Sequence, residues 1–171
     1  MTQLPRKTNV TLIGMPGAGK STIGIILAKY TASGFIDTDV LIQIHQQKSL
    51  QQILDETGYL DLRRIEETEI LKLNVRHHVI ATGGSAVYSQ KAMQHLRSIS
   101  FIVFLQVGYE TLKQRIHNFS TRGIAGPKTQ TFRELFHERR QLYEKYSDQM
   151  VDCEGKNQEE IAEGIASLIS A

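Results

Sequence analysis

The segment Gly14–Thr22, with the sequence GMPGAGKST, constrains this chain more than any other. It matches the pattern G-x-x-x-x-G-K-[ST], in which glycines let backbone N–H groups turn toward an anion. Lys20 can reach the β and γ phosphates of a nucleotide, and Ser21 can offer its hydroxyl to Mg²⁺. The run Val10–Ile13 predicts a buried strand, and Ser21–Tyr30 predicts a helix whose positive N-terminus faces the phosphates. The segment therefore predicts nucleotide binding; a glycine-rich turn that matches by chance is the alternative.

Size and composition indicate one compact domain. The chain has 171 residues, of which 40% are hydrophobic and 22% charged, and its net charge of +2 is too small to indicate a nucleic-acid partner. The longest apolar run, Ile99–Val107, falls far below the roughly 20 residues of a membrane span. The single cysteine, Cys153, fits a reducing compartment. We therefore expect one domain over residues 1–171, in a cytoplasmic monomer that binds neither nucleic acid nor a membrane.

Short apolar runs alternate with helical patterns along the chain, which predicts an α/β sandwich with a mainly parallel sheet. The predicted strands are Val10–Ile13, Gly34–Ile36, Val79–Ala81, Phe101–Leu105 and Met150–Asp152. In such sheets the carboxyl ends of the strands face the ligand crevice, and Gly14, Asp37 and Gly83 lie at or just beyond those ends. Gly83 and Gly84 together indicate close backbone approach to a ligand or a tight turn.

Two carboxylates, Asp37 and Asp39, follow the second predicted strand. On an extended segment, side chains two residues apart point the same way. One carboxylate could hold Mg²⁺, directly or through water, while the other meets a substrate hydroxyl as a base or an orienting group. The alternative is structural, because Thr38 or Asp39 could cap a helix that begins near Val40.

Glu66 shares one face of a predicted helix with Leu62, Ile70 and Leu73. A carboxylate on an apolar stripe needs a partner, and Arg63 lies three residues before it. We therefore expect Glu66 to orient an arginine that faces the cleft. An exposed ion pair on the helix surface is the alternative.

The segment Asn118–Gln130 is long, polar and contains glycine and proline, which predicts a mobile lid. Arg115 and Arg122 could both contact ATP, one near the transferring phosphoryl group and the other against the base. A solvated basic loop is the alternative. On the helix that follows, Arg139 or Arg140 is available to bind an anion.

Taken in order, GMPGAGKST, FIDTD, LRRIE, ATGGS, the pair Arg115 and Arg122, and ERRQLY resemble the shikimate kinase family over nearly the whole chain. The resemblance implies a nucleoside-monophosphate-kinase-like P-loop fold, a three-layer sandwich with a five-stranded, mainly parallel sheet and helices on both faces. Residues 117–131 would form the mobile lid, and residues 39–76 the acceptor-binding helices. ATP and Mg²⁺ would be the cofactors. The acceptor would be a small anionic hydroxy acid, with shikimate, phosphorylated to shikimate 3-phosphate, as the leading candidate.

The resemblance also implies a role for each residue that matches a family motif. ATP would be bound by Gly14, Pro16, Gly17, Ala18, Gly19, Lys20, Ser21, Thr22, Arg115 and Arg122, with residues 152–158 near the base. Ser21 would bind Mg²⁺, and Asp37 would hold the ion indirectly, by contacting the groups that bind it. The acceptor would be bound by Asp39, Arg63, Gly83, Gly84 and Arg139. Lys20, Asp39 and the lid residue Arg122 would carry the catalysis.

The chain departs from the family pattern around the acceptor. The family usually has a third glycine where this chain has Ser85, a phenylalanine in place of Leu62, and often another aromatic near Leu54. The glutamate that commonly follows the glycine is here Tyr59, and the usual lid proline is Gly123, which should loosen closure. These changes alter the walls around the acceptor and leave the charged groups needed for phosphoryl transfer in place.

Alternative functions follow from these departures. A P-loop kinase for a different small hydroxy acid, a polyol or a nucleoside monophosphate would keep the same phosphate loop, and so would a homologue that only binds nucleotide. The residues Asp55–Gly58 match the D-x-x-G of GTPases, but no Asn-Lys-x-Asp motif that reads guanine occurs in the chain.

Overall fold

The computed structural model describes residues 7–116 and 123–170. Its strands form one parallel sheet in the order β2-β3-β1-β4-β5. They are β1 (Asn9–Ile13), β2 (Gly34–Asp37), β3 (His78–Ala81), β4 (Ser100–Gln106) and β5 (Gln149–Asp152). The first and last residues of each strand lie within one residue of the predicted ones. The expected five-stranded parallel sheet is therefore confirmed.

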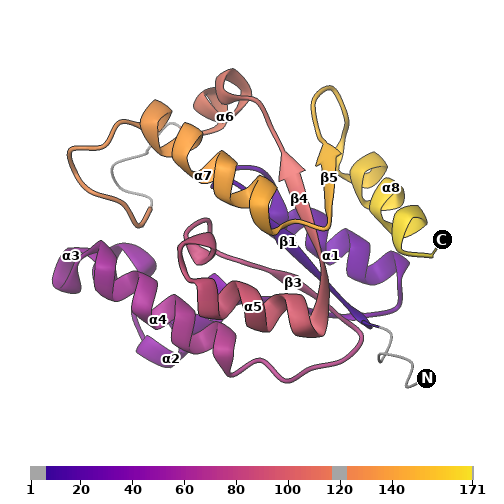
Figure 1. Cartoon of the computed structure of the whole chain (residues 1–171), viewed down its shortest axis with the longest axis horizontal. Coiled ribbons are helices and arrows are strands. Elements are labelled where there is room, and N and C mark those ends of the chain that lie inside the picture. The colour runs from indigo at the N-terminus through magenta and orange to yellow at the C-terminus, as the bar shows by residue number, and fades with distance from the viewer. Residues whose placement is uncertain (1–6, 117–122, 171) are drawn as a thin grey trace.

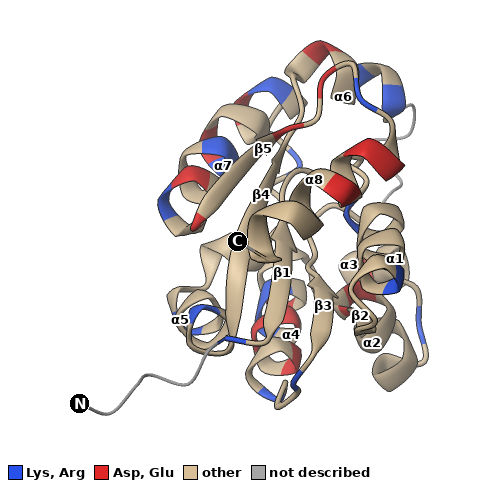
Figure 2. Cartoon of the chain, turned by 90° about the vertical axis from the view of Figure 1, so that its right-hand side faces the viewer, with Lys and Arg blue, Asp and Glu red and all other residues tan. Residues whose placement is uncertain are grey.

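Helices cover both faces of this sheet, as Figures 1 and 2 show. They are α1 (Lys20–Tyr30), α2 (Thr38–Gln46), α3 (Leu50–Thr57), α4 (Tyr59–Leu71), the short 3₁₀ helix η1 (Ala86–Tyr88), α5 (Gln90–Ile99), α6 (Tyr109–Arg115), α7 (Phe132–Tyr146) and α8 (Gln158–Ser170). The helices α1 and α8 lie side by side on one face, and α5 and α7 lie on the other (Figure 1). The expected three-layer sandwich is confirmed.

Local sequence explains where several helices begin. The Asp37 carboxylate accepts hydrogen bonds from the first backbone N–H groups of α2, so this helix starts directly after β2. Ser49 caps the start of α3 and Thr131 caps the start of α7, each in a capping box in which the side chain three positions later accepts a hydrogen bond from the backbone N–H of the cap residue.

The strand register aligns the ends of the three strands nearest the phosphate loop. Ala81 at the end of β3 lies opposite Asp37 at the end of β2, and also opposite Leu12 near the end of β1. Because these strands run parallel, the segments that follow them meet at one edge of the sheet. The phosphate loop, the start of α2 and the turn before η1 are thereby brought together.

The hydrophobic core has two parts. The larger part packs α1, α5, α7 and α8 against the sheet, with fully buried residues such as Leu12, Ile80 and Ile102. A smaller cluster joins α2, α3 and α4 to the chain beyond residue 122, through Ile42, Ile53, Leu62 and Ala125. This second cluster forms a wall beside the sheet edge. Within the described ranges, no helix has both the length and the apolar character to cross a membrane.

Candidate active site

A cavity of about 340 Å³ opens at the carboxyl edge of the sheet. It is lined by residues from the phosphate loop, α2, α3, α4, the turn after β3, α6, α7 and the chain beyond residue 122. The lining residues are Pro16, Gly17, Gly19, Lys20, Ser21, Thr22, Asp39, Ile42, Leu50, Leu62, Glu66, Thr82, Gly83, Gly84, Ser85, Arg115, Gly123, Ile124, Ala125 and Arg139. Of the expected ATP-binding residues, Gly14 and Ala18 support the loop from outside this lining.

The phosphate loop holds Lys20 at the floor of this cavity. Gly17 and Gly19 have φ angles of 82° and 94°, a left-handed conformation that favours glycine. Lys20, with 9% of its surface exposed, donates hydrogen bonds from Nζ to the carbonyl oxygens of Gly14 at 2.7 Å and Met15 at 2.9 Å. Burial lowers the pKa of Lys20 to about 8, although Asp39 opposes this shift. The lysine is therefore a buried cation at neutral pH, suited to phosphate oxygens.

Asp37 joins the phosphate loop to α2. Ser21 Oγ donates a 2.5 Å hydrogen bond to Asp37 Oδ2, while Asp37 Oδ1 accepts from the backbone N–H groups of Asp39 and Val40. The sequence-based expectation of two aspartates on an extended segment was wrong, because the helix begins at Thr38 and Asp39 lies in its first turn. The cap is Asp37 itself, so its structural role and its contact with the phosphate loop coexist.

The pair Ser21 and Asp37 fits a magnesium ion. Hydroxyl and carboxylate oxygens are donors that Mg²⁺ accepts, and Mg²⁺ usually takes its remaining ligands from phosphate and water. In the described part of the chain, no group of three or more His, Cys, Asp or Glu side chains is placed to hold a metal. The donor set therefore suits an ion that arrives with a nucleotide rather than one held by protein alone.

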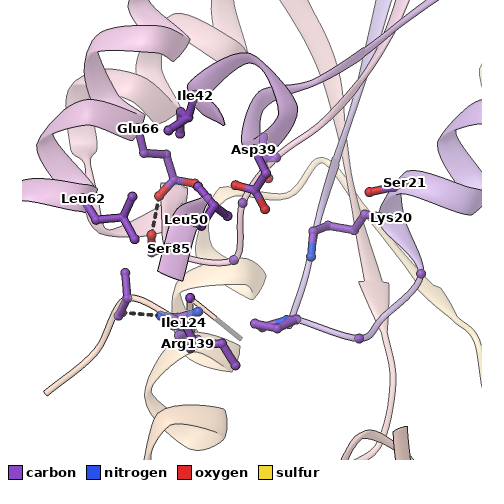
Figure 3. A pocket seen from close by; sticks show the side chains of 18 of the residues that line it. Lys20, Ser21, Asp39, Ile42, Leu50, Leu62, Glu66, Ser85, Ile124 and Arg139 are labelled. Atoms are coloured by element: carbon purple, nitrogen blue, oxygen red, sulfur yellow. Dashed lines mark hydrogen bonds between the residues drawn. The ribbon is translucent and has the colours of Figure 1, made fainter. Parts of the chain in front are cut away.

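Asp39 and Glu66 converge on Gly83 from two helices. A Cβ at Gly83 would overlap Glu66 Oε1 and would lie 2.6 Å from Asp39 Oδ1. Burial of its carboxyl group, reinforced by Asp37, raises the pKa of Asp39 to about 6, and Lys20 and Arg139 oppose this. Figure 3 shows both carboxylates on one side of the cavity, with Lys20 and Ser21 facing them. Glycine at position 83 is thus required by the close approach of two carboxylates.

Glu66 pairs with Ser85 and not with Arg63. Leu62, Glu66 and Ile70 are all buried, which confirms this part of the predicted stripe on α4, whereas Leu73 is buried beyond the end of the helix. The expected partner was wrong, however, because Glu66 Oε2 accepts a hydrogen bond from Ser85 Oγ (Figure 3). Burial raises the pKa of Glu66 to about 7, with Asp39 as the second cause.

Arg63 lies outside the residues that line the cavity. Its guanidinium carbon is 3.6 Å from the ring centroid of Tyr88, a cation–π contact, and its Nη2 donates a 3.2 Å hydrogen bond to the carbonyl oxygen of Ala125. Tyr88 in turn donates a hydrogen bond to Glu138. The structure therefore places Arg63 beside Arg139, since both donate to the carbonyl oxygen of Ala125 and both lie over the ring of Tyr88, but outside the cavity lining to which Asp39 belongs. Its expected contact with an acceptor stays a prediction.

Arg139 enters the cavity from α7, whereas Arg140 faces away. Arg139 is 1% exposed, and a Cβ at Gly84 would lie 2.8 Å from its Nη1. Tyr143, one turn further along α7, donates a 2.6 Å hydrogen bond to the carbonyl oxygen of Gly84. Arg140 instead pairs with Glu144 on the surface of the helix. Of the two arginines left open by the sequence, Arg139 is therefore the one available to an anion in the cavity.

The lid region is only partly described. Arg122 lies outside the described residues, so its expected position remains untested. Arg115 lines the cavity and donates a 3.3 Å hydrogen bond to the carbonyl oxygen of Gly17. Gly123 has a φ of 66°, and a Cβ there would lie 2.8 Å from Leu50 Cβ. Because proline fixes φ near −65°, Gly123 permits a contact with α3 that proline would prevent.

Of the family departures, Leu62, Ser85 and Gly123 line the cavity, and Leu54 lines a neighbouring one between α3 and residues 124–130. Sequence reasoning missed the wall residues Ile42 on α2 and Leu50 on α3, which lie outside the quoted motifs. It also missed Tyr143, for which its spacing of four residues from Arg139 on one helix was an available signal.

Comparison with known proteins agrees with this geometry. A family model described as shikimate kinase matches residues 16–170. A shikimate kinase of Thiobacillus denitrificans is 32% identical over 152 residues, which cover 87% of this chain and 83% of that protein. The solved shikimate kinase from Acinetobacter baumannii in complex with shikimate superimposes with a TM-score of 0.86 at 26% identity, over 95% of this chain and 93% of that one. The shikimate kinase from Aquifex aeolicus does so with a TM-score of 0.81 at 29% identity, over 95% of each chain. The chain belongs to the shikimate kinase family.

Proposed function

We propose that this protein transfers the γ-phosphoryl group of ATP to a hydroxyl of shikimate, giving shikimate 3-phosphate. One observation carries the proposal: a single cavity holds the phosphate-loop Lys20 on one side and the carboxylate of Asp39 with the guanidinium of Arg139 on the other. Phosphoryl transfer needs a donor held by its phosphates opposite an oriented hydroxyl. A small hydroxy acid offers both a hydroxyl for Asp39 and a carboxylate for Arg139.

On the donor side, the phosphate loop binds the nucleotide through its backbone N–H groups and Lys20 Nζ. Ser21 and Asp37 are the residues that would hold Mg²⁺, which supplies charge neutralisation to the phosphates when bound. The short hydrogen bond between Ser21 and Asp37 fixes the hydroxyl at the start of α1. We expect Arg115 to lie on the adenine side, and Arg122 to stabilise the phosphoryl group in transit.

On the acceptor side, Asp39 orients the hydroxyl that attacks. With a pKa raised to about 6, the Asp39 carboxylate is mostly ionised at pH 7 and accepts a hydrogen bond from that hydroxyl. The buried guanidinium of Arg139 binds the carboxylate at the other end of the acceptor. Gly83 and Gly84 leave room for the acceptor between these groups, since side chains at either position would clash with Glu66 or Arg139.

The test is ADP release, measured by a coupled assay with ATP and Mg²⁺, with and without shikimate. We expect strong stimulation by shikimate, and little turnover for Lys20→Ala or Asp39→Asn although both variants remain folded by circular dichroism. Near wild-type rates in either variant would contradict the assigned roles. Stimulation by another hydroxy acid, a polyol or a nucleoside monophosphate, but not by shikimate, would show that the acceptor is that compound and not shikimate. Tight ATP binding without ADP release for any acceptor would indicate a homologue that only binds nucleotide.

A further inference from the structure

Ser85 holds one oxygen of a buried glutamate and leaves the other free. Ser85 is 7% exposed and Glu66 is 3% exposed. Ser85 Oγ donates a hydrogen bond to Glu66 Oε2, while Glu66 Oε1 has no hydrogen-bond partner among the described residues. A buried carboxylate oxygen without a partner is costly, and such atoms in native proteins call for an explanation.

The free oxygen faces the acceptor side of the cavity. Glu66 Oε1 and Asp39 Oδ1 both approach the Cα of Gly83, where a Cβ would meet them. Figure 3 shows the Glu66 side chain between Ser85 and Asp39, pointing into the same space. Any small molecule whose hydroxyl contacts Asp39 therefore places its neighbouring atoms beside Glu66.

The usual candidates for a partner are already engaged. Arg63, one turn before Glu66 on α4, stacks on Tyr88 and donates to Ala125. Lys20 Nζ donates to two carbonyl oxygens of the phosphate loop. The free oxygen is therefore available to a hydrogen-bond donor that comes with the acceptor.

We propose that Ser85 is a positioning residue that turns Glu66 so that its free oxygen binds a second hydroxyl of the acceptor, next to the hydroxyl bound by Asp39. This inference rests on the proposed function and makes Ser85, which stands where the family usually has a third glycine, the residue that sets the orientation of Glu66 toward the acceptor. Ser85 has φ −97° and ψ −2°, a conformation open to any residue, so the serine is required by its hydroxyl and not by its backbone.

The experiment measures shikimate binding by calorimetry in the presence of ADP, together with kinetic constants. Ser85→Ala should raise the dissociation constant for shikimate about tenfold, the effect expected when a hydrogen bond to a charged group is lost, and leave the KM for ATP unchanged. In a Glu66→Leu background, Ser85→Ala should have no further effect, because the serine acts through Glu66. With shikimate analogues that lack one of the hydroxyls that are not phosphorylated, one analogue should abolish the effect of Ser85→Ala.

Ser89→Ala is the matched control. Ser89 donates a hydrogen bond to Glu67 in the same pair of elements, and neither residue lines the main cavity. This variant should bind shikimate as the unchanged protein does. If Glu66→Leu does not fold, Glu66→Gln takes its place in the double-variant comparison.

Unchanged shikimate binding in Ser85→Ala, or an equal loss with every analogue, would overturn the inference while turnover by the unchanged protein still supports the proposed function. Binding of shikimate without ADP release would overturn the proposed function. The effect of Ser85→Ala on shikimate binding would then still decide whether Ser85 positions Glu66. Absence of any shikimate binding by the unchanged protein would overturn both.

Discussion

Arg139 donates a 2.7 Å hydrogen bond from Nη2 to the carbonyl oxygen of Ala125. Arg139 is almost fully buried, and its Nε has no hydrogen-bond partner among the residues that the structure describes. A neutral backbone carbonyl is a weaker partner for a guanidinium than a carboxylate, which accepts two parallel charge-assisted hydrogen bonds. The carbonyl oxygen of Ala125 also accepts a 3.2 Å hydrogen bond from Arg63. Under the proposed function, this carbonyl and the acceptor carboxylate would share the guanidinium of Arg139.

Replacing the guanidinium tests this sharing. Arg139→Lys keeps the charge but removes the planar pair of donors, so the KM for shikimate should rise about 10- to 100-fold, with the KM for ATP within about twofold of wild type. Steady-state kinetics with each substrate varied in turn measures the split. Arg140→Lys is the control, because Arg140 pairs with Glu144 on the helix surface, and it should behave as wild type. Parallel changes in both KM values would contradict a role at the acceptor.

A methyl group at Gly83 should be intolerable. The Cβ of Gly83→Ala would collide with Glu66 Oε1 and crowd Asp39 Oδ1, so we expect turnover to fall at least about 100-fold and stability to fall by roughly 1–3 kcal/mol. Urea unfolding and the ADP-release assay measure the two effects. Gly164→Ala is the matched control, since nothing lies within 4 Å of its added Cβ on α8. The free energy of unfolding of Gly164→Ala should rise by about 0.5–1 kcal/mol. An equal loss of stability in both variants would refute the steric explanation.

The fold and the phosphate side of the site could be predicted from the sequence because local patterns determine them. The strands are short apolar runs, and the phosphate loop is a contiguous motif between a strand and a helix. Asp37 and Asp39 were placed at the correct edge of the sheet for the same reason. Their relative orientation was predicted wrongly, because Asp37 caps α2, which begins at Thr38, so the two residues do not share an extended segment.

The acceptor side depends on contacts between distant segments, which no local pattern encodes. The spacing of Arg63 and Glu66 on α4 favours a pair within the helix. Two side chains that follow β3 compete for them, since Ser85 in the turn donates to Glu66 and the ring of Tyr88 in η1 stacks on Arg63. The choice between these pairings depends on tertiary packing, so the expectation that Glu66 pairs with Arg63 was wrong. The mobility of the lid and the monomeric state stay predictions.

The charge of Asp37 can be separated from its cap. Asp37→Asn keeps a side-chain oxygen for the first N–H groups of α2, and asparagine caps helices about as well as aspartate. We therefore expect a melting temperature close to wild type, but turnover reduced roughly 10- to 100-fold and a half-saturating Mg²⁺ concentration shifted upward. Magnesium titrations in the ADP-release assay measure this. Asp61→Asn, which removes a surface partner of Arg64, should leave turnover and the half-saturating Mg²⁺ concentration unchanged. If Asp37→Asn instead lowers stability without shifting the Mg²⁺ dependence, Asp37 acts only as a helix cap.

Glu66 should make the stability of the fold depend on pH. Its pKa is raised from 4.5 to about 7 by burial and by Asp39, so the folded protein keeps a proton that the unfolded chain releases at lower pH. The contribution of Glu66 to stability is therefore present in full below about pH 4.5 and is lost as pH rises through about 7. Glu66→Gln cannot ionise, so its free energy of unfolding relative to wild type should increase between pH 5 and pH 8, as measured by urea denaturation at each pH. Glu56→Gln, at an exposed position, should follow wild type at both values. A Glu66→Gln curve parallel to wild type would show that this carboxylate is ionised throughout, against the expected direction of its pKa shift.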